Sequence, residues 1–77
     1  MQIQLVTFGK ITEIIPTQQF KVGTISDTDG LRALLQETFP ALGQMKYALA
    51  VNKKLVQANI EFAEDAVIAI MPPFSGG

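Results

Sequence analysis

Near the start of the chain, hydrophobic residues recur with a period of two, which is typical of a β-strand. The pattern covers residues 2–8. Ile3 and Leu5 fall on one face of this predicted strand. Val6 and Phe8 fall on the other, so both faces carry apolar side chains.

A second strand is predicted over residues 17–22, with Phe20 and Val22 facing inward. The segment before it, residues 11–15, is ambiguous. Its β-branched side chains favour a strand, but the same residues also fit a short helical turn. We expect residues 2–22 to form a loose hairpin.

One main helix is predicted in the middle of the chain. Ser26 or Thr28 can supply the N-terminal cap, and the aspartates beside them favour the positive end of the helix dipole. Pro40 and Gly43 end the helix. The side chains that follow the cap at helical spacing form one stripe: Leu31, Leu34, Leu35, Thr38 and Phe39.

The second half of the chain predicts three further strands: residues 47–51, a short return strand at 55–57 and a last strand at 66–71. Asn52 and Lys53 make the turn between the first two, because Asn tolerates the left-handed backbone region. Lys53 and Lys54 are interpreted as solvated turn residues. The last strand is almost entirely apolar, which is typical of a central buried strand.

An apolar surface is predicted on the side of the sheet that the helix leaves uncovered. One helix can cover only one face of a sheet. If Ile68 and Ile70 face the helix, then Val67, Ala69 and Met71 face away from it. Adjacent first and last strands would expose an apolar patch there, and such patches mark partner surfaces.

Composition narrows the functional classes. The chain has 77 residues, enough for one domain, and its net charge of −1 gives no electrostatic case for binding nucleic acid or an anionic membrane. It shows neither a signal-peptide pattern nor an apolar run of bilayer length, so we expect a cytoplasmic protein. With no cysteine and no histidine, it lacks thiolate nucleophiles, the usual zinc ligands and the main acid–base side chain at neutral pH. A self-sufficient enzyme is therefore not expected.

The sequence ends in Pro-Pro-Phe-Ser-Gly-Gly. The prolines stop the last strand and stiffen the path beyond it. Fully extended, residues 72–77 would reach roughly 20 Å, at about 3.3–3.6 Å per residue. Such a tail could carry a terminal carboxylate into a narrow channel of another protein, although a frayed terminus is the simpler interpretation. If the protein takes part in chemistry, the Gly77 carboxylate is the best candidate reactant.

Residues 47–56, Tyr-Ala-Leu-Ala-Val-Asn-Lys-Lys-Leu-Val, together with this ending, resemble the small subunit of molybdopterin synthase. These proteins are the MoaD-type ubiquitin-like sulfur carriers of the MoaD/ThiS family. The resemblance covers most of the chain and implies an α+β fold of the β-grasp (ubiquitin-like) type. This fold is a mixed five-stranded sheet with one main helix. Residues 1–71 would form the domain and residues 72–77 a flexible, extended C-terminal tail.

The resemblance also implies a reaction. An adenylating enzyme of the ubiquitin-activating type would use ATP to adenylate Gly77, and sulfur would then replace AMP to leave a thiocarboxylate. The tail would enter the large synthase subunit and donate sulfur to cyclic pyranopterin monophosphate, which becomes the dithiolene of molybdopterin. The large subunit would supply the catalytic lysines, in a heterotetramer of two small and two large subunits. No permanently bound cofactor or metal is implied for the small subunit.

Individual positions follow from the same resemblance. Phe8, Leu55 and Met71 match positions in the family's apolar contact surface, although Met71 stands where we expect an aromatic residue. Val6, Val67 and Ala69 join this predicted interface through the face that they share. At Gly76 a Cβ would collide with the channel. The residues predicted to enter the channel are Pro72, Pro73, Phe74, Ser75 and Gly76.

Three other functions remain open. The protein could carry sulfur for thiazole synthesis or another thiolation. It could be a modifier joined to lysines of other proteins through Gly77. It could also be an interaction module with an inert tail. The Pro72-Pro73 pair favours the molybdopterin role.

Overall fold

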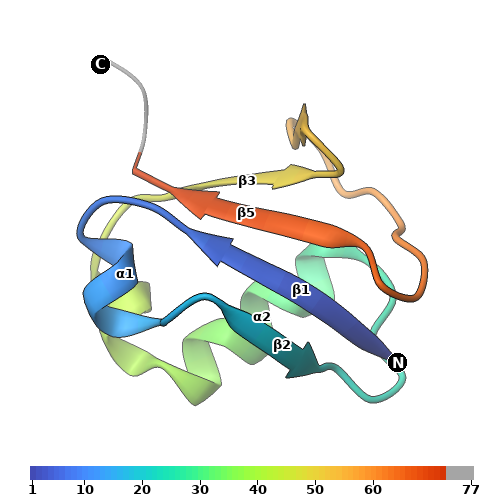
Figure 1. Ribbon diagram of the computed structural model, residues 1–77, viewed down its shortest axis with the longest axis horizontal. Helices are drawn as coiled ribbons and strands as arrows, with labels where there is room; N and C mark the ends of the chain where they lie inside the picture. Colours follow the sequence, from blue (N-terminus) through green and yellow to red (C-terminus); the bar gives the residue numbers. More distant parts are fainter. Residues whose placement is uncertain (73–77) are drawn as a thin grey trace.

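A computed structural model describes residues 1–72. In it, one mixed sheet packs against one main helix (Figure 1). The strands are β1 (Gln2–Thr7), β2 (Gln18–Lys21), β3 (Ala48–Val51), β4 (Lys54–Leu55) and β5 (Val67–Met71). The main helix is α2 (Thr28–Thr38), and two shorter helices are α1 (Ile11–Ile14) and the 3-10 helix η1 (Pro40–Gln44). None of the helices within residues 1–72 has the length and apolar character needed to cross a membrane.

The sheet has the strand order β2-β1-β5-β3-β4. β1 pairs with β2 in antiparallel fashion, which confirms the predicted hairpin over residues 2–22. β1 pairs with β5 in parallel, and β3 pairs antiparallel with both β5 and β4. β5 is thus the central strand, as its apolar character predicted, and β1 is its parallel neighbour.

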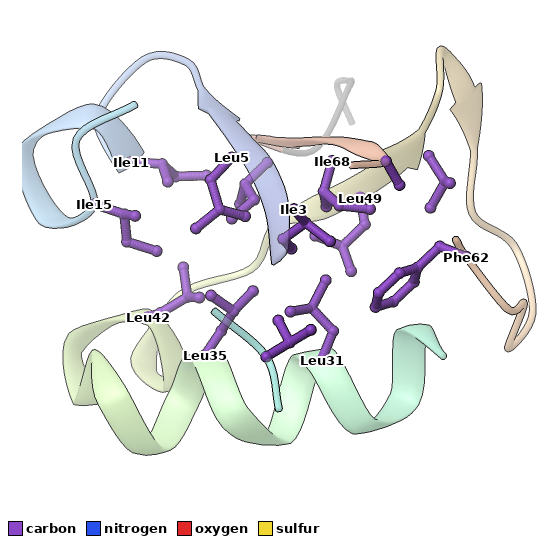
Figure 2. Close-up of a cluster of buried hydrophobic side chains, with 14 residues drawn as sticks. Ile3, Leu5, Ile11, Ile15, Leu31, Leu35, Leu42, Leu49, Phe62 and Ile68 are labelled. Atoms are coloured by element: carbon purple, nitrogen blue, oxygen red, sulfur yellow. The ribbon is translucent and has the colours of Figure 1, made fainter. Parts of the chain in front are cut away.

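The core lies between the sheet and α2, as Figure 2 shows. Ile3 and Leu5 of β1 and Ile68 of β5 point toward the helix and are fully buried. Leu31 and Leu35 meet them from α2. These side chains come from period-two positions on the strands and from the i, i+4 stripe of the helix, so a single apolar layer joins the two.

The start of α2 differs from the prediction. Its N-cap is Asp27, whose side chain accepts a hydrogen bond from the Gly30 amide at 3.0 Å. Thr28 is instead fully buried, and its hydroxyl donates to Asn59 Oδ1 at 3.1 Å and accepts from the Ile60 amide at 3.0 Å. Thr28 therefore ties the helix to the segment before β5, a contact that local sequence does not reveal.

The end of α2 also corrects the predicted stripe. Thr38 is exposed, because the helix ends there and the chain turns into η1 at Pro40. Residues 11–15 resolve as a helical turn rather than a strand. Ile11 and Ile15 are both fully buried, and their spacing of four places them on one side of that turn.

Candidate functional site

The face of the sheet opposite α2 is apolar at one end and polar at the other. On β1 the outward residues are Gln2 and Gln4 at the start, followed by Val6. The strand register extends each half of this face onto a neighbouring strand. Gln4 pairs with Gln19 of β2, and Val6 pairs with Ala69 of β5. The apolar half therefore lies where β1 and β5 end.

The apolar half continues across β3 to the edge strand β4. Ala69 pairs with Ala50, and Ala50 pairs with Leu55. Ala48 pairs with Met71 one step further along. Side chains of paired residues share a face, so these positions form adjoining rows on the surface away from the helix.

These rows form an open groove of about 540 Å³. Phe8 and Leu55 are each 48% exposed, an unusual exposure for large apolar side chains that lie together. The residues that line the groove are Phe8, Ala50, Lys53, Leu55, Ala69, Met71 and Pro72. Six of these seven side chains are apolar, so the surface is suited to receive an apolar segment of another molecule.

The chain leaves β5 at the edge of this groove. The Phe8 amide donates to the carbonyl of Ile70 at 3.1 Å, which holds the end of β5 beside the loop after β1 (Figure 1). Gly9, with φ of +59°, lies so close that a Cβ there would be 3.0 Å from Cγ of Pro72. Pro72 is thus seated against the β1–α1 loop, and the last described residue of the chain borders the groove.

The β3–β4 turn forms the opposite side of the groove. Asn52 and Lys53 have φ of 49° and 76°, so the predicted left-handed turn is confirmed. Asn52 makes two hydrogen bonds with Val67 at the start of β5. Its amide donates to the Val67 carbonyl at 2.8 Å, and its Oδ1 accepts from the Val67 amide at 2.9 Å. Lys53 is exposed as predicted, but it also lines the groove, which the interpretation as a solvated turn residue did not include.

The structure brings four of the predicted interface residues around the groove: Phe8, Leu55, Ala69 and Met71. Val6 and Val67 share the outward face without lining the groove, and Val67 is 41% exposed. Ala50 also lines the groove and was not among the predicted interface residues, although its position two residues before the turn places it opposite Leu55. The remaining predicted site residues lie outside the described part of the chain: Pro73, Phe74, Ser75, Gly76 and Gly77.

The chemistry of the groove is that of a binding surface. Its walls offer hydrocarbon side chains and one lysine. Residues 1–72 contain no group of three or more His, Cys, Asp or Glu side chains that could hold a metal ion. Nothing in this set of side chains supplies a nucleophile paired with a base.

Comparison with solved structures identifies the fold. A chain from the complex of subunits 1 and 2 of molybdopterin-converting factor from Helicobacter pylori is 32% identical, with a TM-score of 0.70 and full coverage of both chains. A protein assigned as molybdopterin converting factor, subunit 1, from Pyrococcus furiosus has a TM-score of 0.85 at 12% identity, over 96% of this chain and 99% of that one. SAMP1 from Haloferax volcanii has a TM-score of 0.77 at 18% identity and covers both chains fully. The last two matches show the fold alone, and they confirm the predicted β-grasp.

The search of curated proteins gave no match. The model of the ThiS family, in contrast, matches residues 5–77, which include the whole groove and the C-terminal Gly-Gly. This match and the full-length relative from Helicobacter pylori agree with the resemblance seen in the sequence. The chain is a β-grasp protein of the MoaD/ThiS type, and it belongs to the ThiS family.

Proposed function

We propose that this protein is the sulfur-carrying small subunit of a molybdopterin synthase. One observation supports it most directly: the chain matches, over its full length and at 32% identity, a chain from a complex of subunits 1 and 2 of molybdopterin-converting factor. The groove fits this role, since it offers an apolar surface to a large subunit. Pro72 borders that surface, and the sequence ends in Gly-Gly.

The chemistry takes place on the Gly77 carboxylate. On an adenylating enzyme, an oxygen of this carboxylate attacks the α-phosphorus of ATP, pyrophosphate leaves, and a glycyl adenylate forms. A sulfur donor then displaces AMP, which is a far better leaving group than oxide, and a thiocarboxylate results. Its sulfur is nucleophilic without any cysteine in the chain. Transfer of this sulfur to cyclic pyranopterin monophosphate, twice, completes the dithiolene.

The large subunit contributes what this chain lacks. It supplies the catalytic lysines and the channel, while the small subunit supplies the docking surface and the sulfur. We infer an assembly of two small and two large subunits. Gly76 leaves the tail without a side chain next to the reacting group, so that bare backbone enters the channel.

Intact mass spectrometry tests the proposal. After incubation with the cognate adenylating enzyme, ATP and a sulfur donor, the mass should change by one oxygen replaced by one sulfur, and fragmentation should place the change at Gly77. Addition of the large subunit and cyclic pyranopterin monophosphate should then yield molybdopterin. Gly76→Val should block this transfer while leaving the thermal unfolding curve unchanged, because a branched side chain does not fit a channel shaped for glycine.

Other outcomes would identify the competing functions. Consumption of the thiocarboxylate only by a thiazole-forming pathway would replace the molybdopterin role with a thiamine role. Amide linkage of Gly77 to lysines of other proteins would indicate a protein modifier. Failure to form any adenylate or thiocarboxylate would refute sulfur carriage altogether.

A further inference from the structure

Among residues 1–72, the groove has one charged lining residue, Lys53. A lysine at such a place lays its aliphatic stem along the apolar surface and keeps its ammonium in water. An apolar wall alone attracts apolar segments without preference, because the hydrophobic effect is non-directional. A single cation at the rim makes the surface favour partner segments that carry negative charge.

The backbone at Lys53 has a conformation that is uncommon for a lysine. Both central residues of the β3–β4 turn have positive φ, 49° at Asn52 and 76° at Lys53. A two-residue hairpin turn of this kind favours Asn followed by Gly, because Gly adopts positive φ without steric cost. Lysine occupies the position that favours glycine, so the turn carries backbone strain at a residue that lines the groove. Strain of this type is concentrated at functional sites.

The next residue, Lys54, provides a comparison inside the same hairpin. Lys54 pairs with Val51, which is buried on the helix side of the sheet. Leu55 pairs with Ala50 on the groove side. The two lysines carry the same charge and are both exposed, but only Lys53 lines the groove.

We propose that Lys53 selects the partner of the groove by charge. The segment that fills the groove presents apolar side chains with a carboxylate beside them, and this carboxylate faces the Lys53 ammonium. The inference rests on the proposed function, in which that segment belongs to the large synthase subunit. Complementary charge at the rim of an apolar interface accelerates association and disfavours partners of the wrong sign.

Binding of the purified large subunit to four variants tests this inference. Lys53→Gln removes the charge and keeps most of the stem, and Lys53→Glu reverses the charge. Lys54→Gln and Lys54→Glu are the matched controls. At about 50 mM salt we expect Lys53→Gln to weaken affinity about fivefold and Lys53→Glu more than about tenfold, mainly through slower association. The Lys54 variants should change affinity by less than about twofold.

Salt provides a second readout. Raising the salt to about 1 M shortens the Debye length to about 3 Å, so the differences between the wild type and the Lys53 variants should nearly vanish.

Lys53→Gly should separate stability from binding. Relief of the positive φ should raise the midpoint of thermal unfolding by several degrees, on the order of 4 °C. The same variant should bind the large subunit at least as weakly as Lys53→Gln, because it loses the stem as well as the charge.

The results distinguish failure of this inference from failure of the proposed function. If the wild-type protein does not bind the large subunit, the proposed function is wrong. If the wild type binds and Lys53→Gln binds equally well, charge selection is refuted. A loss of affinity that persists unchanged at high salt would also overturn the inference, because it would assign the effect to packing of the stem.

Discussion

Replacing Gly9 with alanine tests whether the end of β5 is seated against the β1–α1 loop. Gly9 has φ of +59°, a conformation that costs a residue with a Cβ about 1–2 kcal/mol. The new Cβ would also lie 3.0 Å from Cγ and 3.5 Å from Cδ of Pro72. Pro72 is exposed and can shift, so this contact costs about 1 kcal/mol more, the lower end of overpacking penalties. The free energy of unfolding should fall by about 2–3 kcal/mol in total.

Gly23 supplies a matched control. Its φ is +63°, and a Cβ built there meets nothing within 4 Å. Gly23→Ala should therefore cost only the backbone strain of about 1–2 kcal/mol. Because 1 kcal/mol shifts the melting temperature of a domain of this size by about 4–8 °C, Gly9→Ala should melt about 4–8 °C below Gly23→Ala.

Thermal unfolding followed by circular dichroism measures both variants, and calorimetric titration measures their affinity for the large subunit. Pro72 lines the groove, so the shift that Gly9→Ala forces on it should weaken binding, whereas Gly23→Ala should bind as the wild type does. Equal melting temperatures for the two variants would refute the seating of Pro72 on Gly9. Equal affinities would show that this seating does not shape the docking surface.

Three further changes have defined outcomes. Phe8→Ala removes a ring that is 48% exposed, about 100 Å² of apolar surface. It should weaken large-subunit binding by about 2.5 kcal/mol in calorimetry, and unchanged affinity would exclude the groove as the interface. Thr28→Val leaves the Ile60 amide without its hydroxyl acceptor and should lower stability in urea by about 2 kcal/mol, more than Thr12→Val on the exposed side of α1. Deleting Gly77 should abolish sulfur transfer and leave the melting temperature unchanged; retained transfer would contradict the proposed chemistry.

The local patterns of the sequence predicted the parts of this protein that depend on neighbouring residues. The period of two assigned Ile3 and Leu5 to one face of β1 and Val6 to the other, because successive side chains on a strand point to opposite faces. Asn52 predicted the left-handed turn for an equally local reason, since its short polar side chain tolerates that backbone conformation. The absence of cysteine and histidine made the C-terminal glycine the predicted reactant.

Only the tertiary structure decided which of these residues meet. Phe8 follows β1 and Leu55 lies in β4, far apart in the sequence. They line one groove because β5 and β3 connect these two strands in a single sheet. Thr28 was predicted as a possible helix cap and is instead buried. Its hydroxyl donates to Asn59, a residue from a distant segment that local sequence does not place beside it. Lys53 is exposed as predicted, but only the folded hairpin shows that it also lines the groove, while Lys54 lies on the other face. Periodicity determines the face of a side chain, whereas strand order and register, which are non-local, determine its neighbours.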